Sequence, residues 1–216
     1  MDIVERFLNY TKFNTTTNKE NGLKGVMPSN PTEYELAKFL KEELSSLGIK
    51  DIILQDNAIL IAKIPANCEN TPSIAFFGHL DTSSEQKNDT KAKIVKYTGG
   101  DICLNEEQAI YLKFSDNPEL KKYVGDDIVV TDGSLLGADD MAAIASIVNM
   151  ASYFMQNPDV KHGKIVICFV PDEEQGLLGA KALDVNLLGA DFGYCLDCCE
   201  MGELIYENWN AADCTM

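Results

Sequence analysis

The chain has 216 residues, of which 45% are hydrophobic and 24% are charged, as expected of a soluble globular protein with a sizeable core. Its 18 basic and 34 acidic residues leave a net charge of −16, which disfavours nucleic acid and anionic lipid as partners. No apolar run could cross a bilayer and the acidic N-terminus does not resemble a signal peptide, so we expect a cytoplasmic protein whose 7 cysteines stay reduced.

The N-terminal segment predicts two helices joined by a loop. Apolar residues recur at helical spacing over 2–13, and the polar stretch 14–31 is expected to be the loop. Asn30 can cap the second helix, Thr32 to Glu35 resemble a capping box, and Gly48 is expected to end the helix. Its predicted buried stripe is formed by Leu36, Phe39, Leu40, Leu44 and Leu47.

Apolar runs later in the chain predict the strands of a central sheet. The runs 73–77 and 164–170 are apolar almost throughout, as expected of strands buried on both faces, and 141–155 is predicted to be a mostly buried helix. Strands that alternate with helices predict an α/β three-layer sandwich with a mostly parallel central sheet. A long excursion over 83–127 interrupts this pattern. The other strand candidates are 51–54, 58–64, 94–97, 109–113, 127–131, 191–196 and 203–206.

Polar clusters stand at the ends of these elements. The carboxyl ends of parallel strands meet at the same edge of a sheet, so we expect the clusters to converge there. Several carboxylates gathered around a histidine would repel one another strongly without a cation. Imidazole and carboxylate are suitable ligands for zinc. The clusters are Gly78 to Asp81, Gly137 to Asp140, Pro171 to Glu174, and Asp197.

Spacing within the clusters indicates a division of roles. A metal-bound histidine usually donates its other ring N–H to a carboxylate, and Asp81 could be that partner of His79. Of the adjacent Glu173 and Glu174, one could bind metal while the other acts as a general base. Each cluster alone has an ordinary explanation as a surface hydrogen bond, a helix N-cap or a solvated turn. Together, in order and at element boundaries, they favour metal-assisted hydrolysis.

Longer stretches around these clusters match a known family. From its first helix to its last residues, the chain resembles the N-terminal part of members of the peptidase T family. These proteins are tripeptide aminopeptidases among the two-zinc exopeptidases. The matching stretches are ERFLNY at 5–10, GHLDTS at 78–83, TGGDI at 98–102, TDGSLLGADD at 131–140, PDEEQGLLGAK at 171–181 and GELIYENWNAA at 202–212.

The resemblance implies a zinc-dependent aminopeptidase that removes the N-terminal residue from tripeptides, with small peptides that carry a free N-terminus as substrates. Glu173 would be the general base for the metal-activated water, and Asp81 would orient the histidine ligand. Asp139 would bridge both zincs and would be joined to Asp140 by a cis peptide bond. The implied zinc ligands are His79, Asp139, Glu174 and Asp197.

The chain also departs from the family pattern. Met141 stands where the family has Lys, and Cys198 and Cys199 replace a Gly-rich stretch. These two thiols could pack in the core or compete for metal. Residues 1–207 are expected to be the N-terminal part of a catalytic domain that is C-terminally incomplete, and 208–216 the start of a missing lid and dimerisation domain.

The second zinc would then lack a histidine, because His162 is expected to be a solvated turn residue. We therefore expect one zinc in this chain against two in a complete site, and a homodimer only in the full-length form. One alternative is an inactive truncated fragment that binds about one zinc without turnover. A remote alternative is a thiol-redox protein that uses Cys195 and Cys198, although no helix pattern follows this pair.

Overall fold

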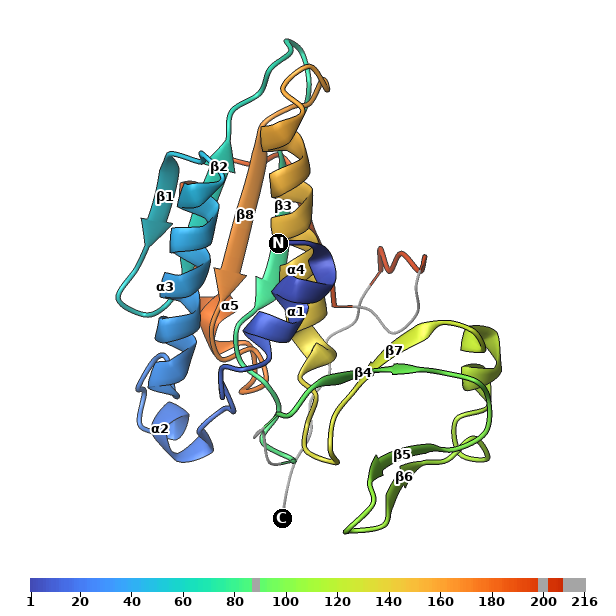
Figure 1. The fold of residues 1–216 in the computed structure, drawn as a ribbon. Helices are drawn as coiled ribbons and strands as arrows, with labels where there is room; N and C mark the ends of the chain where they lie inside the picture. Colours follow the sequence, from blue (N-terminus) through green and yellow to red (C-terminus); the bar gives the residue numbers. More distant parts are fainter. Residues whose placement is uncertain (87–89, 198–201, 208–216) are drawn as a thin grey trace.

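The computed structural model describes residues 1–86, 90–197 and 202–207, and its described part is a mixed α/β fold around a five-stranded sheet (Figure 1). In spatial order its strands are β1 (Asp51–Leu54), β2 (Leu60–Ile64), β8 (Ile165–Val170), β3 (Ile74–His79) and β9 (Phe192–Cys195). The strands β8, β3 and β9 run parallel to one another, whereas β1 and β2 extend the sheet in antiparallel pairing. The predicted parallel arrangement is therefore confirmed for the strands that precede the polar clusters.

Helices cover one face of this sheet. The helices α3 (Pro31–Ser46) and α4 (Ala138–Gln156) lie against it, and α1 (Ile3–Tyr10) packs beside α4 (Figure 1). The larger core lies between these helices and the sheet, because alternate residues of β2 and β8 point toward them. Its fully buried residues include Leu36, Leu40, Leu44, Leu60, Ala62, Ile144, Val148, Ile167 and Phe169.

The opposite face of the sheet has a second, smaller core. It contains Ile61, Val166 and Cys168, and the segment that follows α5 (Leu178–Ala182) packs against them. This segment contains the 3₁₀ turn η2 (Val185–Leu187). Both faces of the sheet are thus covered, as the predicted sandwich requires. Within the described residues, no helix is long and apolar enough to cross a membrane.

The start of α3 differs from the prediction in one detail. Asn30 is the N-cap, as predicted, but its capping-box partner is Glu33 and not Glu35. The Asn30 side chain accepts the N–H of Thr32 at 3.0 Å, and Glu33 Oε1 accepts the N–H of Asn30 at 3.1 Å. The third residue of a helix makes this return bond, and with Asn30 as N-cap that residue is Glu33.

Other boundaries are also corrected by the structure. The predicted loop 14–31 contains a short helix, α2 (Lys19–Leu23), which Asn18 caps. The predicted strand 203–206 is not a strand. Its apolar side chains are exposed, and within the described residues it pairs with no other strand. The predicted segment 208–216 and the pair Cys198 and Cys199 lie outside the described residues.

The excursion between β3 and α4 forms a small unit of its own. The strands β4 (Lys93–Lys96) and β7 (Asp127–Val130) pair antiparallel at its base, beside the five-stranded sheet (Figure 1). Farther out, β5 (Ile102–Asn105) pairs with β6 (Ile110–Leu112), and the 3₁₀ turn η1 (Pro118–Tyr123) follows. The sequence did not predict β5 or η1. The unit has its own small core of Tyr97, Ile102, Leu120 and Val130.

Candidate metal centre

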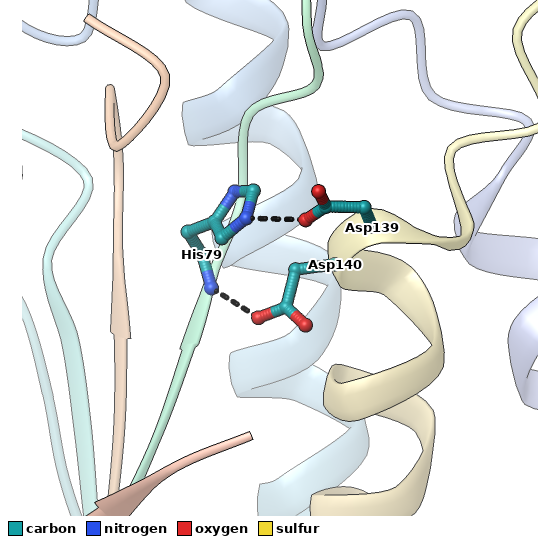
Figure 2. A group of neighbouring side chains, drawn as sticks. All are labelled: His79, Asp139 and Asp140. Atoms are coloured by element: carbon teal, nitrogen blue, oxygen red, sulfur yellow. Dashed lines mark hydrogen bonds and ion pairs between the residues drawn. The ribbon is translucent and has the colours of Figure 1, made fainter. Parts of the chain in front are cut away.

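His79 lies at the carboxyl end of β3, in the interior of the candidate site, and is 2% exposed. Its Nδ1 is 2.9 Å from the backbone carbonyl oxygen of Asp81 and 3.4 Å from Asp81 Oδ1, so both acceptors of Nδ1 belong to the predicted orienting residue. Its Nε2 is 2.8 Å from Asp139 Oδ1 (Figure 2). Because Nδ1 is engaged with Asp81, Nε2 is the nitrogen that can bind a metal.

The charge state of His79 follows from these contacts. Burial lowers the pKa of the imidazole, but hydrogen bonds to Asp139 and Asp81 and the negative charge of Asp140 raise that pKa to about 11. The acidic neighbours thus favour the cationic ring in the metal-free chain. A cation bound at Nε2 would lie between the same imidazole and Asp139.

Asp139 and Asp140 approach His79 from the start of α4. The peptide bond between them is cis, as the family resemblance implies, and both residues have non-helical backbone angles. Figure 2 shows that they contact different parts of His79: Asp139 reaches the ring, and Asp140 Oδ2 accepts the backbone N–H at 2.8 Å. Asp140 is 3% exposed, and burial is the main cause that raises its pKa to about 8.

Asp81 is fully buried and connects the ends of two strands. Its Oδ1 accepts the backbone N–H of Glu173 at 2.8 Å, and its Oδ2 accepts the N–H of Glu174 at 3.0 Å and the hydroxyl of Thr17 at 2.8 Å. Burial raises the pKa of Asp81, but these donors and His79 outweigh it and hold the pKa below its ordinary value. The Asp81 carboxylate therefore fixes the turn after β8 against the end of β3.

The turn after β8 is also held from α3. The N–H of Asp172 donates to Glu33 Oε2 at 3.0 Å, and Asp172 Oδ2 accepts the N–H of Ser29 at 2.8 Å. Three consecutive N–H groups, from Asp172 to Glu174, thus donate to buried carboxylates. Sequence reasoning missed Glu33, Ser29 and Thr17. Only the capping position of Glu33 is visible in the sequence, and it does not indicate a contact with Asp172.

The predicted site residues come together in two overlapping groups. Among the described residues, ligand atoms of His79, Glu173 and Asp197 lie within 4.8 Å of one another, as do those of His79, Asp139 and Asp140. Glu174 belongs to neither group. Burial first, and then the negative charge of Asp139, raises the pKa of Glu174. Ala138, Leu196 and Asp197 are among the residues that line a cavity of about 360 Å³ beside the cluster.

The donor set fits a divalent cation. One imidazole nitrogen and several carboxylate oxygens are the ligands that zinc accepts in catalytic sites. Burial raises the pKa of Glu173, and the negative charges of Asp197, Asp81 and Glu174 raise it further, against the opposing charge of His79. A cation at Nε2 of His79 would relieve this repulsion among the carboxylates.

His162 and Cys195 have other surroundings. His162 precedes β8, at the opposite end of the strand from the turn that carries Glu173, and its ring lies 4.8 Å from that of Phe154. His162 is half-buried, whereas the sequence predicted a solvated position for it. Desolvation and the charges of Asp197 and Asp140 raise the pKa of the Cys195 thiol to about 11, opposite to the shift of a reactive redox thiol.

Comparisons with known proteins match the chain to one family model and to curated relatives. Residues 60–186 match the model of a family described as Peptidase family M28. The chain is 44% identical over 217 residues to peptidase T of Alkaliphilus oremlandii, and 45% identical over 215 residues to that of Parabacteroides distasonis. Each alignment covers 98% of this chain and 52% of the relative, so the chain spans about half the length of the curated relatives it matches.

Solved structures show the same fold. An aminopeptidase PepT from Bacillus cereus has a TM-score of 0.63 and 25% identity, and the match covers 91% of this chain and 43% of that one. A tripeptidase from Staphylococcus aureus has a TM-score of 0.61 at 23% identity, covering 92% of this chain and 43% of that one.

Proposed function

This chain belongs to peptidase family M28, and from that membership we propose that it carries the catalytic part of a zinc-dependent aminopeptidase acting on tripeptides. The observation that carries this function is the convergence of His79, Glu173 and Asp197 beside Asp139 at one edge of the sheet. The tripeptide substrate rests on the resemblance to peptidase T. An acidic site attracts the ammonium group of a free N-terminus, which favours removal of the first residue.

Each residue has a role in this function. His79 Nε2, Asp139 and Asp197 would hold one zinc, and Asp139 and Glu174 would contribute to a second. A bound zinc would polarise the scissile carbonyl group and lower the pKa of the water molecule bound to it. Glu173 takes a proton from the attacking water and passes it to the leaving amine.

Two features of the chain suit Glu173 to this task. Burial raises its pKa above the ordinary value, which makes its carboxylate a stronger base. Its backbone N–H donates to Asp81, so the residue that orients His79 also fixes the position of the base.

The test is release of the N-terminal amino acid from a tripeptide by purified chain with added zinc. Glu173→Gln keeps the shape of the side chain but cannot accept the proton, so kcat should fall by about 10²–10⁴-fold. The zinc content, measured by mass spectrometry, should stay unchanged. Glu107→Gln is the matched control, because Glu107 is exposed on the excursion. Equal activity of Glu173→Gln and the control would remove Glu173 from the mechanism.

A zinc-binding protein without turnover is the second candidate. It is favoured because His79 is the one imidazole in either ligand group of the described residues, and Glu174 lies outside both groups. This candidate predicts about one tightly bound zinc per chain and no release of amino acid. Native mass spectrometry that found two zincs per chain at micromolar concentration would exclude it.

A further inference from the structure

Glu33 makes a contact that its place in the helix does not require. It is the third residue of α3, and its Oε1 accepts the N–H of the N-cap Asn30 at 3.1 Å, as in any capping box. Its Oε2 accepts the backbone N–H of Asp172 at 3.0 Å, from the turn after β8. Glu33 is 0% exposed, so both bonds are shielded from water.

The same motif in α1 shows what capping alone looks like. Glu5 is also the third residue of its helix, and its Oε2 accepts the N–H of the N-cap Asp2 at 2.9 Å. Glu5 is exposed and has no partner across the fold in the hydrogen bonds found for it. Burial of a carboxyl group is unfavourable unless its hydrogen bonds compensate. Capping therefore does not explain why Glu33 is buried.

The turn that Glu33 contacts has a backbone that needs support. Asp172 has φ +51°, in the left-handed region that residues with a side chain rarely adopt. Its carboxylate accepts the N–H of Ser29 at 2.8 Å, while its own N–H donates to Glu33. The segment before α3 and the turn after β8 thus bind each other reciprocally, and Glu173 and Glu174 follow immediately.

We propose that Glu33 is a positioning residue for the metal centre: through the backbone of Asp172 it holds the turn that presents Glu173 and Glu174. The roles of Glu173 and Glu174 rest on the proposed function. The contact itself rests only on geometry. Asp81 accepts the N–H groups of Glu173 and Glu174, and Glu33 accepts the N–H of Asp172 before them, so the two buried carboxyl groups together fix the turn.

Three variants test this role by hydrogen exchange of the amides of 172–174, followed by mass spectrometry. Glu33→Ala removes the acceptor of Asp172 N–H, and exchange at the turn should accelerate about tenfold or more. Glu5→Ala loses the same capping bond in α1 and should leave this exchange unchanged. Glu33→Gln keeps one carbonyl oxygen for Asp172 and should restore most of the protection. Unchanged exchange in a folded Glu33→Ala overturns the proposal.

Steady-state kinetics on the same variants measure the consequence for the site. In Glu33→Ala, kcat per folded molecule should fall about tenfold with KM within about twofold, and Glu33→Gln should recover most of it. A merely structural role would lower the melting temperature and leave kcat per folded molecule intact, which would overturn the proposal. If Glu33→Ala does not fold, Glu33→Asp keeps a carboxyl group but is one methylene too short to reach Asp172, and the same expectations apply.

The two readouts separate this proposal from the function on which it rests. If the unaltered chain releases no amino acid, the aminopeptidase function fails, and hydrogen exchange alone decides whether Glu33 holds the turn. Faster exchange in Glu33→Ala but not in Glu5→Ala would still support the positioning role. Equal exchange in these two variants would overturn it whatever the activity.

Discussion

Asp81 Oδ1 accepts the backbone N–H of Glu173 at 2.8 Å, so a residue just beyond β3 fixes the backbone just beyond β8. The two segments are brought together by parallel pairing of β3 with β8, and their last residues are adjacent in register. The geometry of the site therefore depends on the sheet and on one buried carboxylate that joins two of its strand ends.

Asp81→Asn should weaken this junction. The carboxylate accepts from Thr17, Glu173 and Glu174, whereas an asparagine has one acceptor oxygen and brings an NH₂ group toward those donors. We expect the free energy of unfolding to fall by about 1–3 kcal/mol and zinc affinity to fall by about 10- to 100-fold. Urea unfolding and competition with a zinc chelator measure the two effects. Asp51→Asn, at an exposed position, is the control, and equal behaviour of the two variants would contradict the prediction.

The metal-free chain should lose stability as the pH rises from 6 to 9. Burial raises the pKa of Glu33 from 4.5 to about 9 and that of Asp140 from 3.8 to about 8. For His79, burial lowers the pKa but hydrogen bonds to Asp139 and Asp81 raise it from 6.5 to about 11. Each group binds its proton more tightly in the folded chain, so stabilisation present at low pH is lost as the proton leaves.

Only groups whose protonation changes between pH 6 and 9 decide whether the free energy of unfolding falls or rises over this range. The pKa of Asp81 is shifted downward, so its opposite contribution changes only below its ordinary value and not between pH 6 and 9. Urea unfolding in the presence of a chelator at both pH values measures the effect. Glu33→Gln should flatten the profile, because it removes one of the titrating groups. A free energy of unfolding that stayed constant or rose with pH would contradict the assignment.

Gly78→Ala should disturb the contact between Asp140 and His79. A Cβ at Gly78 would lie 3.0 Å from Asp140 Oδ2 and 3.3 Å from Ile144 Cγ1, both of which are in the packed interface between β3 and α4. Asp140 Oδ2 is the atom that accepts the His79 N–H, so the side chains of Asp140 and Ile144 must give way at this contact. We expect a loss of about 1–3 kcal/mol in stability and weaker zinc binding. Titration calorimetry that showed wild-type zinc affinity would contradict this.

Glu43→Ala should destabilise the fold far from the site. Glu43 Oε1 accepts from Arg6 Nε at 2.8 Å and its Oε2 accepts from the hydroxyl of Tyr10 at 2.7 Å, with all three side chains buried. Removal of Glu43 leaves a buried guanidinium without its counter-charge, and we expect a loss of about 3–5 kcal/mol. Lys19→Ala breaks the exposed pair with Glu85 and should change the urea midpoint very little. Similar losses in both variants would show that burial does not decide the effect.

Local signals in the sequence predicted much of the fold. The runs that became β3 and β8 are short and apolar, and the polar residues after them could be placed at one edge of a parallel sheet. Asn30 and Pro31 marked the start of α3 because capping depends on residues close in sequence. The antiparallel addition of β1 and β2 was not predicted, because strand order depends on contacts between distant segments.

The contacts that hold the site were harder to predict. Glu33 has a complete local explanation as a capping residue, so its bond to Asp172 becomes visible only in three dimensions. The opposite error occurred at 203–206, where apolar residues predicted a strand. Leu204 and Tyr206 are 62% and 85% exposed there, and within the described residues no strand pairs with this segment.

The excursion between β3 and α4 has a consequence for how this chain tolerates changes in length. Its base is closed by the β4–β7 pair and by the hydroxyl of Thr90, which donates to the carbonyl oxygen of Leu135 at 2.6 Å. Asp81 and Asp139, which flank the excursion, therefore stay in place whatever the length of chain between β5 and β6. Each doubling of a flexible loop costs only about 0.6 kcal/mol. The β5–β6 turn is thus a position where a reporter peptide can be inserted without moving Asp81 or Asp139.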